Sequence, residues 1–294
     1  MSRCFIFVVF ALLVTSALAD LRIATYNLDN YLVMDRRLGD RWFPEYPKPE
    51  SEKSVVRRII REAAPDILAL QEVGTVEFLE ELRADLAEEG LDYEYFVHLD
   101  GPDPVRHLAL LSKLPLLEAV RHTDLDFKYF DGRERVKRGM LEVSFKHEDG
   151  ALFKLFVVHL KSKYTENEND PDSQLRRTRE AEACRNRIVE RTFDLGVNRF
   201  LVAGDFNDHP ASAALRRFYS RGDLEIGSLL PAADSRGEVW TYFYQKQAQY
   251  SLVDGFVASG GIVPSIKDGR GHIVDSPGAL DGSDHRMVYL DLVE

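Results

Sequence analysis

Short apolar runs of strand length recur along this chain, and several of them end abruptly in Asp, Asn, Glu or His. The clearest is residues 200–203, which lead directly into Gly204-Asp205-Phe206-Asn207-Asp208. Four apolar residues are enough for a buried strand and too few for a buried helix. Taken alone, the polar end predicts an ordinary turn, because Asp and Asn bond to their own backbone. Repetition of the pattern in other strands favours a functional site built on rigid supports.

The residues at these strand ends are of the types that bind cations and activate water. No serine or cysteine stands beside a histidine in a nucleophile arrangement, and no glycine-rich phosphate loop is present, so water is the expected nucleophile. Carboxylates without cysteine ligands favour hard cations, namely Mg²⁺ or Mn²⁺, with Ca²⁺ as a further candidate. The strand-end residues are Asn27, Glu72, His159, Asp205, Asn207, Asp284 and His285, while Asp254 lies inside another strand.

The first 19 residues have the pattern of a secretory signal peptide. Arg3 supplies the positive start, residues 5–14 the apolar middle, and Ala17-Leu18-Ala19 a small-residue cleavage site before Asp20. The apolar run is too short to span a bilayer, so cleavage is favoured over an uncleaved anchor. We therefore expect export to the periplasm or the extracellular space, with residues 20–294 as the mature domain.

Cysteine content and net charge restrict the disulfides that the chain can form and the partners that it can bind. After cleavage only Cys184 remains, which excludes an intrachain disulfide and indicates a buried structural thiol. The formal net charge of −11 argues against tight, nonspecific binding of nucleic acid through charge alone. It does not exclude a nuclease, because divalent cations held by carboxylates reverse the local sign of the field.

Hydrophobic periodicity predicts a strand-rich chain with helices placed between the strands. Hairpin-linked strands with outer helices indicate two packed sheets, each covered by helices, rather than one parallel sheet. Residues 28–50, rich in charge, aromatics and proline, are expected to form a long functional loop. Expected strands cover 21–26, 66–70, 93–98, 108–112, 116–122, 136–145, 152–159, 200–203, 250–257 and 286–292. Expected helices run from Ser51 to Pro65, from Thr75 to Gly90, over 173–193, and from near Pro210.

The helix expected over 173–193 carries a row of arginines. Acidic residues at neighbouring positions of the same helix favour a solvated face of ion pairs for most of them. Alternatively, the arginines of 176–179 line the approach to a site together with Lys161 and Lys163. The five arginines are Arg176, Arg177, Arg179, Arg185 and Arg187, and the acidic partners are Glu180, Glu182 and Glu190.

Five motifs occur in order along nearly the whole mature chain: Thr25-Tyr26-Asn27, Leu70-Gln71-Glu72-Val73, His159-Leu160-Lys161-Ser162-Lys163, Gly204-Asp205-Phe206-Asn207-Asp208 and Ser283-Asp284-His285. This set resembles that of the endonuclease/exonuclease/phosphatase superfamily, which includes pancreatic-type deoxyribonucleases, abasic-site endonucleases, inositol phosphatases and neutral sphingomyelinases. The resemblance implies a four-layer α/β sandwich, two packed mixed β-sheets flanked by helices, with the site at one edge of the paired sheets.

The resemblance also implies roles at the metal and the water. Glu72 would be the principal metal ligand, with Asn27 and Asp284 in the same metal shell. Asp205 would orient or deprotonate the attacking water.

Further implied roles concern the phosphate. Asn207 would hold a phosphate oxygen, and His285 would contact the phosphate with its ring fixed by Asp254. His159 would lie on the other side of the scissile phosphate, as donor to it or to the leaving group, and the sequence offers no carboxylate partner for it. Arg138 aligns with a phosphate-contacting arginine of part of the family.

The favoured function is an exported metal-dependent nuclease acting on nucleic acid, with DNA favoured over RNA, as a monomer without an obligate protein partner. The alternative is a phosphatase or a phospholipid phosphodiesterase of the sphingomyelinase kind, for which Trp240-Thr241-Tyr242-Phe243-Tyr244 is the candidate membrane-contacting segment. A binding module without activity ranks last. Such a protein would have lost at least one of its catalytic side chains, and all of Glu72, Asp205, Asn207 and His285 are present.

Overall fold

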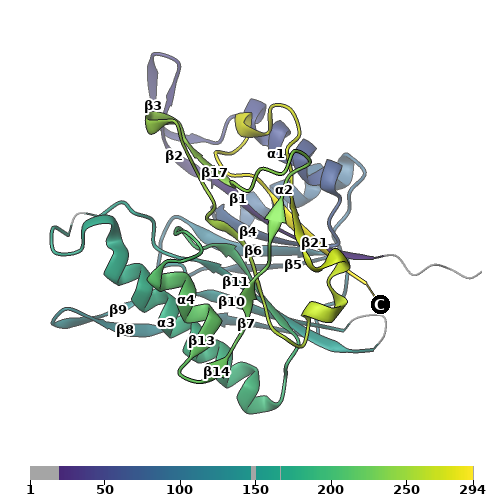
Figure 1. The fold of residues 1–294 in the computed structure, drawn as a ribbon. Coiled ribbons are helices and arrows are strands. Elements are labelled where there is room, and N and C mark those ends of the chain that lie inside the picture. The colour runs from purple at the N-terminus through teal and green to yellow at the C-terminus, as the bar shows by residue number, and fades with distance from the viewer. Residues whose placement is uncertain (1–19, 147–149, 166, 294) are drawn as a thin grey trace, which may run out of the picture.

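Two β-sheets pack face to face in the computed structural model, which describes residues 20–146, 150–165 and 167–293 (Figure 1). The first sheet has the order β16 (Ala232–Ala233), β20 (Gly271–Ile273), β21 (Val288–Leu292), β1 (Leu21–Tyr31), β4 (Ile67–Val73), β6 (His107–Ser112) and β5 (Tyr95–Leu99). The second has the order β15 (Ser228–Leu229), β19 (Asp254–Ala258), β12 (Phe200–Asp205), β11 (Leu152–His159), β10 (Met140–Lys146) and β7 (Glu118–His122). Both sheets contain parallel and antiparallel neighbours, as predicted.

Helices cover the outer face of each sheet, which confirms the predicted sandwich. Ile59 of α1 (Glu50–Ala63) and Leu82 of α2 (Val76–Glu88) belong to one buried cluster with Leu70 of β4. Cys184 of α3 (Gln174–Arg191) and Phe218 of α4 (Ala213–Tyr219) belong to another, against the second sheet. None of the helices within the described ranges is long and apolar enough to cross a membrane.

A third cluster fills the space between the two sheets. Successive side chains of a strand point to opposite faces, so each central strand serves two cores. On β12, Leu201 and Ala203 face the first sheet, whereas Phe200 and Val202 pack beneath α3 and α4. Burial on both faces explains why this strand is an uninterrupted apolar run in the sequence.

Parallel pairing brings the polar strand ends to one edge. β1 pairs in parallel with β4, and β11 pairs in parallel with β12, with His159 in register with Asp205. Gly204 lies within β12, where a Cβ atom would stand 1.9 Å from the carbonyl oxygen of Val158. The glycine therefore permits close approach of the two strands.

The prediction of a long loop over 28–50 is wrong. The chain continues β1 to Tyr31 and then forms a hairpin of β2 (Val33–Leu38) and β3 (Arg41–Pro47), which projects from the body in Figure 1. Gly39, at φ +61°, and Asp40 form its turn. The hairpin is not packed against a core, so its sequence lacks the apolar alternation that would have revealed it.

Smaller differences follow from local geometry. The strand expected over 250–257 is divided into β18 (Gln249–Ser251), which pairs with β17 (Tyr242–Tyr244), and β19 of the second sheet. The sequence also missed the hairpin of β8 (Asp126–Tyr129) and β9 (Gly132–Arg135) and the short pair of β13 (Ser220–Arg221) and β14 (Leu224–Glu225). Single 3₁₀ turns are η1 (Pro171–Ser173), η2 (Phe193–Leu195), η3 (Gln245–Gln247), η4 (Val263–Ser265), η5 (Lys267–Gly269) and η6 (Ala279–Asp281). The predicted signal peptide lies outside the described residues.

Candidate active site

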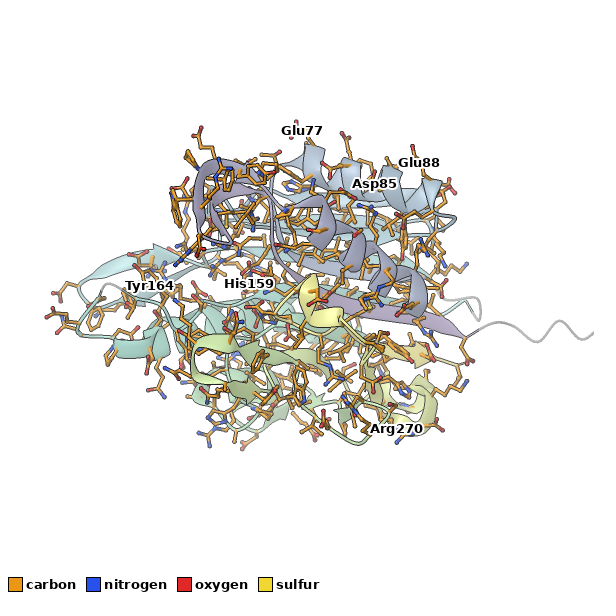
Figure 2. The ribbon with its side chains drawn as sticks, turned by 90° about the horizontal axis from the view of Figure 1, so that it is seen from above. Glu77, Asp85, Glu88, His159, Tyr164 and Arg270 are labelled. Atoms are coloured by element: carbon orange, nitrogen blue, oxygen red, sulfur yellow. The ribbon has the colours of Figure 1, made fainter. Side chains whose placement is uncertain are left out.

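The polar strand ends converge on one pocket of about 630 Å³. Figure 2 shows His159 in the middle of the molecule, between the two layers, and Tyr164 toward its edge. Of the residues predicted for the site, the pocket is lined by Glu72, Asp205, Asn207, Asp284 and His285. Asn27, Arg138, His159 and Asp254 are buried.

Asp205 accepts three hydrogen bonds from neighbouring residues of the site. Its Oδ1 accepts the backbone N–H of Asn207 at 2.8 Å, and its Oδ2 accepts the side-chain amides of Asn27 and Asn207, both at 3.0 Å. Desolvation and the negative charges of Asp254 and Glu72 raise the pKa of Asp205 to about 7. A carboxyl group with a pKa near neutrality can accept and release a proton at physiological pH.

His159 has the carboxylate neighbours that the sequence could not identify. Its Nε2 lies 3.4 Å from Asp205 Oδ2 and 3.8 Å from Glu72 Oε1, whereas its buried Nδ1 has no hydrogen-bond partner among the described residues. Desolvation and the positive charges of Arg138 and His285 hold the pKa of His159 well below its usual value. The ring is therefore neutral, and these contacts favour the tautomer with its proton on Nε2.

His285 has the opposite protonation state. Its Nδ1 lies 2.8 Å from Asp254 Oδ2, in the orientation that the sequence predicted. Burial opposes a charge on this ring, but the carboxylates of Asp254, Asp205 and Asp284 outweigh it and raise the pKa of His285 well above its usual value. The Nε2 of this protonated ring lies 3.9 Å from Asp205 Oδ2 and 3.8 Å from Asp284 Oδ1.

An oxygen-rich group that fits a divalent cation lies around Glu72. The residue has a φ of +62° at a bulge in β4, and its Oε2 accepts the backbone N–H of Asn30 at 3.0 Å. Asn30 Oδ1 is buried without a hydrogen-bond partner among the described residues. Desolvation and the carboxylates of Asp29 and Glu72 raise the pKa of Asp284 to about 7. Crowded oxygen donors of this kind suit Mg²⁺, Mn²⁺ or Ca²⁺, whose charge would relieve the repulsion.

Asp205, Asp254 and His285 form a second group whose ligand atoms all lie within 4.8 Å of one another. Two of the three are already paired with each other, and a protonated imidazole cannot ligate a metal. The oxygen donors around Glu72 and Asp284 therefore fit a divalent cation better than this second group does. Asn27 lies close to these donors, because Ser283 Oγ donates to its backbone carbonyl oxygen at 2.7 Å.

Arg138 is buried, and its Nε lies 3.2 Å from Asp103 Oδ2. Its Nε and Nη1 have no hydrogen-bond partner in the described part of the chain. Its charge lowers the pKa of His159, so it stands near the site without lining the pocket. Direct contacts thus join the eight other predicted residues into one group, whereas the ion pair of Arg138 is with Asp103.

Three residues close to Glu72 were missed in the prediction from the sequence. Asp29 and Asn30 line the pocket, and Arg106 Nε lies 3.7 Å from Glu72 Oε2. The first two could have been found, because they continue the polar run that begins at Asn27. Arg106 gave no signal, since only the pairing of β4 with β6 brings it beside Glu72.

Comparison with known proteins places the chain in a family. The sequence model described as the Endonuclease/Exonuclease/phosphatase family matches residues 24–285, from the first strand to the histidine of the site. The chain belongs to the endonuclease/exonuclease/phosphatase family. Members of this family are phosphoester hydrolases that depend on divalent metal ions. None of the curated proteins compared with the chain matches it.

Solved structures of the endonuclease/exonuclease/phosphatase family share the fold. The human Nocturnin catalytic domain with bound sulfate anion is 17% identical with a TM-score of 0.62, over 92% of this chain and 93% of that one. Beta toxin from Staphylococcus aureus with bound magnesium ions is 13% identical with a TM-score of 0.65, over 94% and 100%. Sphingomyelinase C from Streptomyces griseocarneus is 16% identical with a TM-score of 0.62, over 93% and 99%. At these identities the likeness establishes the fold.

In this member of the endonuclease/exonuclease/phosphatase family, α3 holds the segments that carry the site. Glu180 accepts the backbone N–H of Lys161 at 2.8 Å and that of Lys137 at 3.1 Å. Arg177 donates to the carbonyl oxygen of Lys161 at 3.0 Å and to Asp208 Oδ2 at 3.0 Å. Both side chains are at most 2% exposed, so the expected solvated arginine face is wrong for Arg177.

The other arginines of α3 divide between the two expectations. Arg176, Arg179 and Arg187 pair with Glu180, Glu182 and Glu190 respectively, as the helix pattern predicted. Arg185 also pairs with Glu182, but it is buried rather than solvated. None of the α3 arginines lines the described pocket, but Lys163 does. Of the basic residues expected to line the approach to the site, Lys163 in the segment after β11 is the one that does so.

Proposed function

We propose that this protein is an exported, metal-dependent nuclease that hydrolyses phosphodiester bonds, with DNA favoured over RNA. The observation that carries the proposal is the position of Asp205, whose Oδ2 lies 3.4 Å from Nε2 of His159 and 3.9 Å from Nε2 of His285. The His159 ring is neutral and the His285 ring is protonated. The carboxylate of Asp205 therefore lies between one neutral and one charged imidazole. The protein acts as a monomer in this proposal.

The side chains divide the chemistry among them. Asp205 orients the attacking water and takes its proton. His285, held protonated by Asp254, stabilises the negative charge that develops on the nonbridging oxygens. The side-chain amide of Asn207 donates to Asp205 Oδ2 and to the carbonyl oxygen of Leu160, so Asn207 orients the base. His159 donates from Nε2 to the opposite side of the phosphate.

A divalent cation held by Glu72 and Asp284, with Asn27 beside them, would supply Lewis-acid stabilisation of the phosphate. These donors are all oxygen atoms, which is the preference of Mg²⁺ and Mn²⁺. Lys163 on the pocket wall offers a positive charge for a flanking phosphate and supports a polyanionic substrate.

The second candidate is a phospholipid phosphodiesterase of the sphingomyelinase kind, or a phosphatase. One observation favours a lipid surface: the hairpin of β2 and β3 exposes Trp42 at 64%, Val33 at 42% and Tyr46 at 37%. An aromatic side chain at the tip of a projecting hairpin suits a membrane interface. The similarity to the Streptomyces griseocarneus sphingomyelinase is compatible with the same substrate.

A substrate panel with added Mg²⁺ or Mn²⁺ separates these candidates. The panel contains single-stranded DNA, plasmid DNA, RNA, sphingomyelin vesicles, inositol phosphates and bis(p-nitrophenyl) phosphate. We expect hydrolysis of DNA at the highest kcat/KM and complete loss on chelation. Hydrolysis of sphingomyelin in preference to every nucleic acid would replace the proposal with the second candidate, and activity that survives exhaustive chelation would contradict both.

A further inference from the structure

A row of aromatic rings leads outward from His285 along β17. The ring centroids of His285 and Tyr242 are 4.7 Å apart, and those of Tyr242 and Tyr244 are 6.4 Å apart with ring planes at 21°. Both tyrosines are partly exposed and line the same pocket as the site residues. We refer to His285, Tyr242 and Tyr244 as the aromatic ladder.

Backbone hydrogen bonds fix the ladder to the site. The N–H of Phe243 donates to the carbonyl oxygen of Asp284 at 2.9 Å, and the N–H of Arg286 donates to that of Thr241 at 2.7 Å. Thr241 Oγ1 also accepts the backbone N–H of Asp254 at 3.0 Å. These bonds attach β17 and the preceding Thr241 to the segments that carry Asp254 and His285, which places the side chains of β17 beside the phosphate site.

Because side chains alternate along a strand, the two faces of β17 contact different neighbours. Phe243 stacks on Tyr250 at 4.6 Å, and Trp240 contacts the same ring at 4.7 Å, on the face away from the ladder. These three rings support the hairpin, whereas Tyr242 and Tyr244 face the pocket. The segment expected to contact a membrane thus directs two of its tyrosines toward the reaction centre.

We propose that the aromatic ladder is a binding subsite for the nucleobase next to the scissile phosphate, with Tyr244 as the residue that determines it. The inference rests on the proposed nuclease function and names the part of the substrate that the site recognises. Near-parallel tyrosine rings offer a flat face to a flat base, and the side chains of Gln247 and Gln249 in the same pocket can bond to base edges.

The geometry favours a base over the quaternary ammonium of a lipid headgroup. An ammonium group is recognised by a cage of rings that surround it. Tyr242 and Tyr244 instead lie side by side along one strand, with their planes 21° apart. A base can reach this row only when it is unstacked from its neighbours, so single-stranded nucleic acid is the form that fits.

The test compares a thymidine oligonucleotide with an oligonucleotide of the same length in which every residue is abasic. We expect the wild-type protein with Mg²⁺ to cleave the thymidine oligonucleotide with a kcat/KM about tenfold higher, as expected for one stacked base. Tyr244→Ala removes this preference, and Tyr244→Phe retains it because the ring remains. Tyr46→Ala, which removes an exposed tyrosine outside the pocket, retains the preference and serves as the matched control.

The outcomes separate this inference from the proposed function. Equal cleavage of both oligonucleotides by the wild-type protein, or an unchanged preference in Tyr244→Ala, contradicts the binding of a nucleobase by the aromatic ladder. Either result leaves the proposed phosphodiester hydrolysis unaffected. A loss confined to sphingomyelin hydrolysis in Tyr244→Ala overturns it in favour of a lipid headgroup. Failure of the wild-type protein to cleave any phosphodiester contradicts the proposed function itself, and the ladder with it.

Discussion

Nδ1 of His285 and Oδ2 of Asp254 lie 2.8 Å apart, in a pair buried at the centre of the site. Because the carboxylate raises the pKa of the ring, His285 stays protonated at neutral pH and can hold a phosphate. The protonation state of His285, and with it the pH range of activity, therefore depends on Asp254. This relationship yields the first prediction.

Asp254→Asn lowers kcat/KM for phosphodiester hydrolysis by about 10²-fold at pH 7, because the amide no longer stabilises the imidazolium. The sign is set by the raised pKa: the active, protonated ring is lost as pH rises through the folded pKa, and the variant moves that loss to lower pH. A pH–rate profile of both proteins with added Mg²⁺ checks this. An unchanged alkaline limb in a folded Asp254→Asn protein would argue against the role of His285.

A second prediction concerns the hold of α3 on Lys161. Arg177→Lys removes the guanidinium that donates to both the Lys161 carbonyl and Asp208, and Glu180→Gln removes the charge of the group that accepts the Lys161 N–H. Neither change touches the substrate, and we expect kcat to fall about 10-fold to 100-fold with KM nearly unchanged. Arg179→Ala is the matched control, because Arg179 is exposed on the same helix and pairs only with Glu182 among the described contacts. Equal effects of all three substitutions would mean that only general stability was changed.

The contrast between Arg177 and Arg179 shows what could not be predicted from the sequence. The Arg177 side chain has the same chemistry as that of Arg179, and the helical pattern gave both the same expectation. The difference arises from Asp208 and the Lys161 carbonyl, which other elements bring beside Arg177. Burial of a charged residue depends on partners far away in the sequence, and no local pattern contains them.

Local patterns were sufficient where one strand carries its own signal. Asp205 and Asn207 follow an apolar run directly, whereas the pairing of Asp254 with His285 was implied only by the resemblance to the family. The environment of His159 could not be predicted in this way, because Asp205 reaches it through the pairing of β11 with β12 and Glu72 comes from the opposite sheet. The hairpin of β2 and β3 was missed because Pro44 and Pro47 resemble loop residues.

A third prediction concerns stability at acidic pH. Buried Glu142 on β10 accepts hydrogen bonds from His122, Lys154 and Arg191. Burial opposes its charge, but these bonds outweigh it and lower the pKa of Glu142 to about 2 from a usual 4.5. Its contribution to stability is therefore complete above about pH 4.5 and is lost as pH falls toward 2.

Glu142→Gln should destabilise the protein by about 3 kcal/mol at pH 7, because it leaves buried cations without their partner. The difference between variant and wild type should shrink as pH falls below 4.5. Urea unfolding at a series of pH values measures both. A difference that stays constant from pH 7 to pH 3 would show that the charge of Glu142 does not stabilise the fold.

A fourth prediction concerns export. We propose that the protein made in a secreting host loses residues 1–19, so that the mature chain begins at Asp20. Amino-terminal sequencing and the intact mass of protein recovered outside the cytoplasm measure the cleavage site. A chain that keeps Met1 to Ala19 after fractionation would contradict both the cleavage and the proposed location.

The central claim is that side chains distant in the sequence form one hydrolytic centre around Asp205. The most direct measurement is Mg²⁺-dependent cleavage of single-stranded DNA by Asp205→Asn, beside His272→Ala, a control in β20 whose ring stacks on Tyr289 outside the described pocket. The account predicts a loss of at least about 10³-fold in kcat for Asp205→Asn, with its melting temperature retained, and wild-type cleavage by the control. Cleavage near the wild-type rate by a folded Asp205→Asn protein would contradict it.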